Sequence, residues 1–414
     1  MISTQVEGYA KKGDITLSRM MQAMSPVFVP RHAYGSAAVG SEGSAVDRLK
    51  KFMKWRSDAE EEAWMAETGW NLLTFAAAMD DGPAVDELLS QDAATVERLF
   101  AAKGNDMVCP GNSKKGTPLR REPLGQKLLE FAKDMTPMIA STTFASRAVC
   151  EKMMDAGGAA AVERDGLKLL GARPCLFRGA IVRRSVLQLL DGVAVDRSPT
   201  QVAGKHENVK LVLERYPHIA KQLDPDYGTC VLHMACGTTA CRGQSKVMKE
   251  LLACPGAMEN LNSVNSPIFG SVLGTACFFE DQDPETVRLL LEAGADPSKP
   301  EVLHPTAVKF RRMTWVGKTL FGDVQARGMH KLLSTLPANF KQSPTHIAAQ
   351  QGDLAKIKVL AEHEKFPVAQ YEDTKGRTPV ALCVEDTVKT AVAEIVGPAV
   401  VATPIPGNKV APEQ

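Results

Sequence analysis

The feature that most constrains the fold is a short pattern that returns along the chain. Residues 343–352 read SPTHIAAQQG and residues 376–383 read GRTPVALC, so Ser343 and Thr378 stand 35 residues apart. Similar starts are GWNLLTFAAA (from Gly69), TPMIAST (from Thr136), SPTQVAG (from Ser198) and GTCVLHMAC (228–236). Such recurrence predicts a chain of stacked units, each stabilised by its neighbours.

A second apolar block follows these starts. Its apolar residues are spaced at i, i+3 and i+4, which is the spacing of one helix face. The blocks read AVDELL (84–89), AVCEKMM (148–154), SVLQLL (185–190), VKLVLE (209–214), KVMKELL (246–252), TVRLLLEAGAD (286–296) and KIKVLAE (356–362). We therefore expect two short helices in each unit.

The residues at the unit boundaries have a physical explanation. Serine or threonine before proline predicts a helix N-cap, and proline is tolerated at the first helical position, where an N–H would have no helical partner. The small pairs Ala76-Ala77 and Ala348-Ala349 predict a first helix that lies close to its neighbours. Gly157 and Gly294 are expected to end second helices in the left-handed conformation.

The recurring pattern resembles the ankyrin repeat, whose unit reads roughly G-x-T-P-L-H-x-A-A, a polar turn, then V-V-x-L-L-L-x-x-G-A-D. The resemblance covers about residues 66–396. It implies an all-α fold, an ankyrin-type helical-repeat solenoid of about eight or nine degenerate repeats. Three units depart from the pattern. The unit from Ser198 has a short first helix, the unit from Cys230 carries an insertion, and the unit near 301–337 keeps little of the motif.

The resemblance also implies a role for His346 and His233. The family places a histidine at this position that hydrogen-bonds backbone and neighbouring turns, which joins one unit to the next. Zinc is the alternative for His233, because Cys230, Cys236 and Cys241 are also ligand types that zinc accepts. Each of these residues stands where the repeat normally has a small residue or the structural histidine, so we predict no metal site.

The repeats divide the chain. The predicted array spans residues 68–396 and contains an inserted loop near 100–134. Residues 45–67 predict an amphipathic N-terminal capping helix, because a terminal repeat would otherwise expose apolar surface. Residues 1–44 are expected to be irregular or flexible, with a targeting segment as the alternative. Residues 397–414 are Pro-rich and predict a flexible tail.

Composition bears on partners and compartment. A formal net charge of +1 gives no general attraction to nucleic acid or anionic membrane. No stretch reaches the roughly 18 apolar residues of a membrane span. The nine cysteines form no CxxC pair, which is typical of reduced, buried thiols. We expect a cytoplasmic protein with no nucleic-acid or membrane partner; the nucleus is the alternative, and organelle targeting is less favoured.

These features favour a protein-interaction scaffold or adaptor over an enzyme. The sequence contains no HExxH, GxSxG or dinucleotide-type GxGxxG motif, and we predict no catalytic residue and no cofactor. The resemblance implies a monomer, or a member of a hetero-complex, that binds a partner protein through its concave face and hairpin tips. The candidate contact residues, chosen by register, are Trp70, Asn71, Asp226, Tyr227, Asp373, Lys375 and Arg377.

Two other readings stay open. The chain could be a regulatory or inhibitory subunit of an enzyme or a ubiquitin-ligase complex, or an enzyme that works on the solenoid surface. A deep pocket lined by ionisable groups with shifted pKa values would favour chemistry, and a shallow grooved face would favour binding. The basic cluster from Lys114 to Arg121 is a further candidate contact for an acidic partner.

Overall fold

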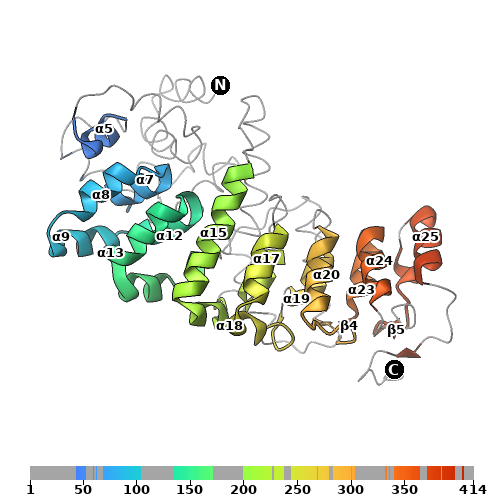
Figure 1. Cartoon of the computed structure of the whole chain (residues 1–414). Coiled ribbons are helices and arrows are strands. Elements are labelled where there is room, and N and C mark those ends of the chain that lie inside the picture. Colours follow the sequence, from blue (N-terminus) through green and yellow to red (C-terminus); the bar gives the residue numbers. More distant parts are fainter. Residues whose placement is uncertain are drawn as a thin grey trace, which may run out of the picture. The chain divides into compact units, whose positions relative to one another are not determined.

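The structure, a computed structural model, is mostly helical with a few short strands (Figure 1). It describes residues 43–52, 59, 62, 69–103, 135–170, 199–225, 228–236, 244–267, 269–278, 283–299, 301–303, 332, 335, 340–363, 371–383, 385–396 and 403–404. The chain divides into two compact units, Met1–Arg215 and Tyr216–Gln414. The predicted all-α class is confirmed. In the described ranges, no helix has the length and apolar character that crossing a bilayer requires.

Unit 1 is built from pairs of helices. Its elements are α5 (Ala45–Phe52), α7 (Leu72–Met79), α8 (Gly82–Leu89), α9 (Ala93–Ala101), α12 (Pro137–Phe144), α13 (Arg147–Asp165), η1 (Gly166–Leu170) and α15 (Pro199–Arg215). The pair α7/α8 packs on the pair α12/α13, with α7 against α12 and α8 against α13. Helix α15 then packs against both α12 and α13.

Unit 2 contains more helix pairs and three two-stranded sheets. Its helices are η2 (Pro217–Lys221), α16 (Val231–Cys236), α17 (Gln244–Leu252), α18 (Pro255–Met258), α19 (Val272–Phe278), α20 (Pro284–Glu292), α23 (Pro344–Gln351), α24 (Leu354–Glu362), η3 (Val380–Leu382) and α25 (Asp386–Val396). Its strands are β1 (Asn265–Ser266), β2 (Gly270–Ser271), β3 (Glu301–Leu303), β4 (Phe340–Gln342), β5 (Tyr371–Glu372) and β6 (Thr403–Pro404). Strands β1–β2 and β3–β4 pair antiparallel, and β5–β6 pair parallel.

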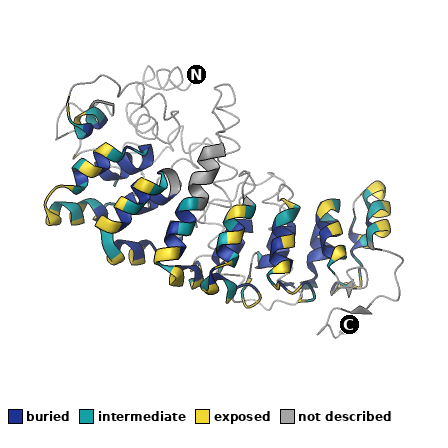
Figure 2. Ribbon diagram, in the orientation of Figure 1, coloured by how far each residue is buried: buried dark blue, intermediate teal, exposed yellow. Residues whose placement is uncertain are grey.

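The helices of unit 2 form two rows. The first helices pack in the order α16, α19, α23 and η3, and the second helices pack in the order α17, α20, α24 and α25. Figure 1 shows the second row standing side by side. All residues of α16 and α19 are buried, whereas α17, α20 and α24 alternate buried and exposed positions (Figure 2). Helices α16 and α19 of the first row are therefore core, and the second row carries the amphipathic helices.

Small residues let the first helices approach closely. Ala76 and Ala77 of α7 are fully buried, as are Ala348 and Ala349 of α23. Proline opens α12 and α23 at their first positions, and the side chains of Thr136 and Ser343 cap the two helices. These observations agree with the caps and close packing that the sequence predicts.

The predicted unit near 301–337 has to be corrected. Helix α19 packs directly on α23 and α20 directly on α24, so no further helix pair is stacked between them. Leu303 pairs with Phe340 in the β3–β4 ladder, and this pairing joins the ends of the intervening chain. The described residues hold five pairs of α-helices, and η3 with α25 makes a sixth, so the count of eight or nine units for the whole chain stays a prediction.

Two local expectations also fail. Helix α15 runs without interruption from Pro199 to Arg215, so the start at Ser198 is not followed by a separate short first helix. Within α13 it is Gly158, not Gly157, that has a positive φ, of 61°, and this residue interrupts the helix. A Cβ on Gly157 would lie 2.8 Å from both Phe100 and Met138, so this glycine is required for close packing. Gly294 does have a positive φ of 92°, as expected.

The predicted termini and inserted loop are partly described. Helix α5 packs against α8 with Leu49 fully buried, and the backbone amide of Ala45 donates to Glu87 Oε2 at 2.8 Å. Beyond Phe52 the predicted capping helix lies outside the described residues, except for Ala59 and Glu62. Residues 1–42 and 104–134, and most of the predicted tail, also lie outside them.

Candidate functional site

His346 joins the helix pair α23/α24 to the turn before η3. Its Nε2 lies 2.9 Å from the carbonyl oxygen of Arg377, which can only accept, so Nε2 carries the proton. Its Nδ1 accepts from the Ser343 backbone N–H at 3.3 Å and lies 2.6 Å from Ser343 Oγ. Both ring nitrogens are engaged and the side chain is fully buried. The predicted structural role is confirmed by these contacts.

His233 makes the same connection two helix pairs earlier, from α16 to the turn before α19. Its Nε2 lies 2.9 Å from the carbonyl oxygen of Gly270, and its Nδ1 lies 3.1 Å from Cys230 Sγ. Cys230 here takes the place that Ser343 has beside His346. Gly270 and Arg377 each come immediately before the residue whose side chain caps the next helix, Ser271 and Thr378. The two histidines therefore reach equivalent carbonyl groups.

The third equivalent position is filled differently. Gly274 follows the capping Ser271 by three residues, which is where histidine stands in the other two helix pairs. A Cβ on Gly274 would lie 1.7 Å from Oε1 of Glu301, so the carboxyl group fills the space of the missing side chain. Glu301 is fully buried and accepts from Gln342 Nε2 at 3.2 Å across the β3–β4 pair.

Asp373 organises the turn that receives His346. Its Oδ1 accepts from the backbone N–H groups of Lys375 and Arg377 at 2.8 and 3.0 Å, and its Oδ2 accepts from Arg377 Nε at 2.8 Å. These bonds engage both carboxylate oxygens within the turn, and the residue is 2% exposed. The turn also bonds to β4, because Lys341 N–H donates to Thr374 Oγ1 at 2.6 Å. Thr374, Lys375 and Gly376 remain exposed at its tip.

The predicted contact residues thus differ in how far they are exposed. Trp70 is buried against Phe75, with ring centroids 5.1 Å apart, and Asn71 is a buried N-cap that also bonds to the carbonyl oxygen of Leu99 at 2.7 Å. Neither side chain offers surface to a partner, so both are corrected to structural residues, and Asp373 joins them as a turn-forming residue. Lys375 is exposed and Arg377 is half-buried. Asp226 and Tyr227 lie outside the described residues.

The thiols near His233 are held in structural positions. Burial raises the pKa of the Cys230 thiol to about 11, and burial also raises the pKa of Cys236 well above its ordinary value. Zinc binds thiolates, which these surroundings disfavour. Across the described part of the chain, no group of three His, Cys, Asp or Glu side chains could hold a metal ion. Cys241 lies outside that part.

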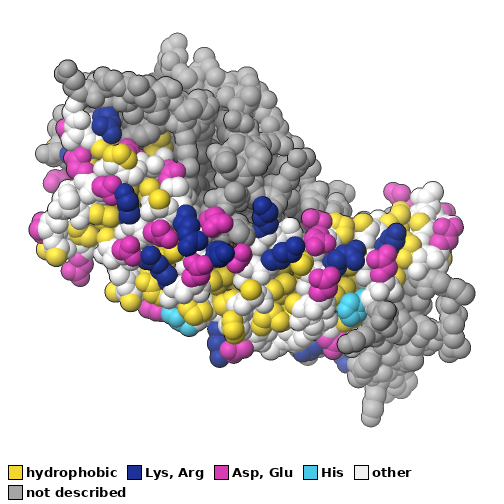
Figure 3. Space-filling model, in the orientation of Figure 1, with side chains coloured by type: hydrophobic (Ala, Val, Ile, Leu, Met, Phe, Trp, Pro, Cys, Tyr) yellow, Lys and Arg dark blue, Asp and Glu magenta, His cyan; other side chains and the backbone are white. Residues whose placement is uncertain are grey.

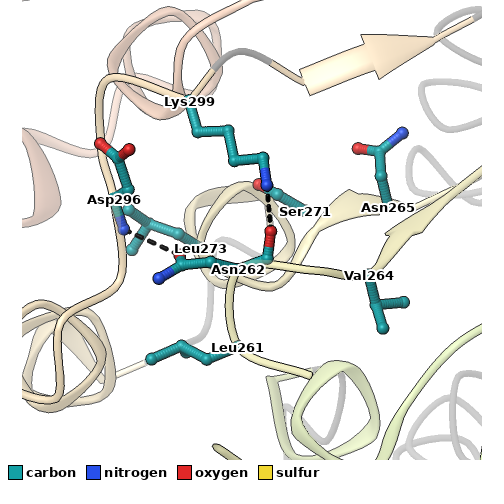
Figure 4. A pocket seen from close by; sticks show the side chains of 8 residues that line it. All are labelled: Leu261, Asn262, Val264, Asn265, Ser271, Leu273, Asp296 and Lys299. Atoms are coloured by element: carbon teal, nitrogen blue, oxygen red, sulfur yellow. Dashed lines mark hydrogen bonds between the residues drawn. The ribbon is translucent and has the colours of Figure 1, made fainter. Parts of the chain in front are cut away.

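Unit 2 also contains a pocket that no sequence motif indicated. It is lined by Leu261, Asn262, Val264, Asn265, Ser271, Leu273, Asp296 and Lys299, with a volume of about 260 Å³ (Figure 4). These residues come from the segment after α18, from β2 and the start of α19, and from the turn after α20. Because the pocket borders the β1–β2 turn, it belongs to the same series of turns as Asp373. The only sequence signal was the G-A-D motif ending at Asp296, which marks a turn and not a cavity.

The second helices present a different surface. Acidic and basic side chains interleave across it (Figure 3). In unit 1, Arg147 contacts Glu207 and Glu214 of α15 at 3.2 and 2.9 Å, and Arg215 contacts Asp155 at 2.5 Å. In unit 2, Arg288 of α20 contacts Glu362 of α24 at 3.8 Å. In each unit, therefore, some charges of these helices pair with charges of a neighbouring helix.

Comparisons with known proteins add no relative. The chain matches no protein-family model and no curated protein at a significant level.

Proposed function

We propose that the chain is an ankyrin-like stack of helix pairs that binds a partner protein through the turns of unit 2. The observation that carries the proposal is the repeated contact from a buried imidazole to the carbonyl group before the next cap, seen at His233–Gly270 and His346–Arg377. Contacts of this kind fix each turn against the preceding helix pair. They support a rigid edge of turns, and rigid turns on a helical scaffold suit recognition.

The turn edge is defined here by exposed residues of three turns: Asn265, then Asp296 and Lys299, and the tip 374–376. Strand β2 contacts β3, β3 pairs with β4, and β4 is bonded to Thr374, so these turns follow one another along the edge. Its exposed cations include Lys299 and Lys375, whereas Asp373 is buried and paired with Arg377. The edge therefore favours a partner with acidic groups, because complementary charge increases association rates and selectivity.

The remaining parts of the proposal follow from the same arrangement. In it His346 and His233 are structural and the protein is not an enzyme. The described cysteines are free thiols, which accords with a cytoplasmic location. Neither nucleic acid nor membrane is proposed as a partner, because the near-zero net charge supplies no general attraction to either.

The proposal is tested by charge reversal at the turn edge. Proteins bound by the full chain in cell extract would be identified by mass spectrometry for the parent, for Lys375→Glu, and for the control Lys358→Glu. Lys358 is also exposed, but it lies on α24. A partner that uses the edge should be recovered about tenfold less with Lys375→Glu and unchanged with Lys358→Glu. Equal recovery with all three proteins would contradict the proposal.

A further inference from the structure

One asparagine, Asn262, connects two of the segments that line the pocket of Figure 4. Asn262 Nδ2 donates to the carbonyl oxygen of Gly294 at 2.8 Å, and Asn262 Oδ1 accepts from the Asp296 backbone N–H at 3.0 Å. Its side chain therefore bonds both sides of the turn after α20. Lys299 Nζ also donates to the carbonyl oxygen of Asn262. These three bonds connect the loop after α18 to the turn after α20, the two segments on either side of the pocket.

The pocket has an apolar floor and a rim that carries Lys299 and Asp296. Leu261 and Leu273 are 4% and 3% exposed and form its base, with Val264 beside them. At the rim the Asp296 carboxyl group turns toward its own turn and away from Lys299 Nζ, because its Oδ1 accepts from the N–H and the hydroxyl of Ser298 at 2.9 and 2.5 Å (Figure 4). Lys299 has three N–H donors and gives one to a backbone carbonyl.

The charge of Lys299 is not balanced as the charges on the second helices are. Among the described residues no carboxylate forms an ion pair with Lys299, whereas Arg147, Arg215 and Arg288 each contact carboxylates of neighbouring helices. An exposed ammonium group beside an apolar cavity is complementary to a ligand that is apolar at one end and anionic at the other.

The size of the pocket selects the kind of ligand. Small-molecule sites usually occupy about 300–1,000 Å³, and an engineered cavity of about 150 Å³ is enough to bind benzene. A volume of about 260 Å³ lies between these values, so it suits one large apolar side chain better than a cofactor.

We propose that this pocket receives a leucine-sized side chain from an extended acidic segment of a partner protein, with the next carboxylate pairing with Lys299. The inference deepens the proposed function and rests on it, since it names the chemistry that the turn edge would recognise. The pocket supplies apolar burial, and Lys299 supplies selection against basic segments.

The test uses methyl NMR on the full chain with three short probes: acetyl-Leu-Glu-Glu-amide, acetyl-Leu-Lys-Lys-amide and acetyl-Gly-Glu-Glu-amide. The leucine-acidic peptide should shift the methyl signals of Leu261, Val264 and Leu273 in a saturable way, with a millimolar dissociation constant. The other two peptides should shift them at least about fivefold less at equal concentration. No saturable shift with the leucine-acidic peptide, or equal shifts with the basic one, would overturn the inference.

Variants separate the pocket from the rest of the edge. Lys299→Glu should weaken binding of acetyl-Leu-Glu-Glu-amide by about fivefold or more, and Lys249→Glu on α17 is the matched control that should leave it unchanged. Equal effects of the two substitutions would overturn the inference. If the peptide fails to bind but Lys375→Glu still reduces partner recovery, the inference about the pocket is wrong and the proposed function stands.

Discussion

The two units join successive helix pairs with different side chains. In unit 2 a buried imidazole three residues after the cap reaches the carbonyl group of the next turn. In unit 1 the equivalent positions hold Thr74 and Ile139, which cannot do this. There Asn208 of α15 donates instead to the carbonyl oxygens of Thr142 and Ala145 at 3.2 and 2.9 Å. The comparison teaches that the packing requires a donor for buried carbonyl groups, and that more than one residue type can supply it.

In unit 1 the capping side chains also make the longer connections that the histidines make in unit 2. Asn71 caps α7 and also bonds to Leu99 of α9, and Thr136 caps α12 and also donates to Asp165 Oδ2 at 2.5 Å. In unit 2 Ser343 serves its own helix and His346 makes the longer connection. The same physical requirement is met from the cap in one unit and from the next turn of helix in the other.

Raising the pH should lower the free energy of unfolding of both units, because their buried thiols ionise more easily in the unfolded chain. This is the largest effect that we expect. Burial raises the pKa of Cys150 in unit 1 to about 12 and that of Cys230 in unit 2 to about 11, from an ordinary value of 9.0. Because the folded pKa is the higher one, stability is full below pH 9 and falls as pH rises toward 11. Each thiol should cost about 2 kcal/mol at pH 11. Urea unfolding at pH 8 and pH 11 would measure the loss.

Matched variants assign this loss to each unit. Cys150→Ala should remove the part of the pH-dependent stability loss that arises in unit 1, and Cys230→Ser should remove the part that arises in unit 2. Other titrating groups stay the same in parent and variants. A pH dependence identical in all three proteins would show that these thiols are not held protonated by burial.

His346→Ala should destabilise unit 2 by about 3 kcal/mol, because it leaves a cavity and an unpaired carbonyl group at Arg377. Hydrogen exchange followed by mass spectrometry should show faster exchange across α23, α24 and residues 373–383. The comparison between units predicts that α7 and α12 keep their protection. Ser343→Ala is the milder control, at about 1 kcal/mol. Uniform loss of protection in both units would contradict the local role.

Gly274→Ala should destabilise unit 2 by about 2 kcal/mol, because the added methyl group overlaps the carboxyl group of Glu301. The double variant with Glu301→Ala should be more stable than the sum of the two single changes predicts, since removing the Glu301 carboxyl group leaves space that the added methyl group fills. Denaturant unfolding of the four proteins measures the coupling. Strict additivity would show that Glu301 does not occupy the space beside Gly274.

Asn208→Ala should destabilise unit 1 by about 1–2 kcal/mol, because two buried carbonyl groups lose their donor. Faster hydrogen exchange in α12 and α15, with α23 unchanged, is the expected pattern. Equal exchange in parent and variant would mean that other groups satisfy the carbonyls of Thr142 and Ala145.

Arg147→Ala should give the smallest effect, about 0.5 kcal/mol, because the ion pairs of Arg147 with Glu207 and Glu214 are largely exposed to water. The hydrogen bond to Glu214 is the main cause that raises the pKa of Arg147. The loss should shrink further in high salt, which denaturant unfolding at two salt concentrations would measure. A loss of stability as large as that of Asn208→Ala would show that the surface ion pairs contribute as much as the buried amide, contrary to this prediction.

The parts predicted from the sequence are those encoded within a few residues. Ser343-Pro344 and Thr136-Pro137 mark caps by local chemistry, and the i, i+3, i+4 blocks mark the second helices. The role implied for His346 and His233 was right because the capping geometry fixes where each imidazole can point. These signals need no knowledge of which segments meet in space.

The rest depends on contacts between segments far apart in the chain. Glu301 lies well downstream of Gly274, and no periodicity indicates that its carboxyl group fills the space there. Asn71 and Trp70 stand at turn positions by register, but their burial comes from packing with α9 and Phe75. The pocket beside Lys299 is shaped by three separate segments, so it has no local motif at all.

The β3–β4 pair has a consequence for how such a chain can diversify. Leu303 and Phe340 are held opposite each other while α19 touches α23 directly, so both contacts are made by residues outside the stretch between those two. Closing a flexible loop costs only about 0.6 kcal/mol more for each doubling of its length. This is therefore a place where evolution or an engineer could splice in additional sequence, even a whole foreign domain, while leaving the architecture around it undisturbed.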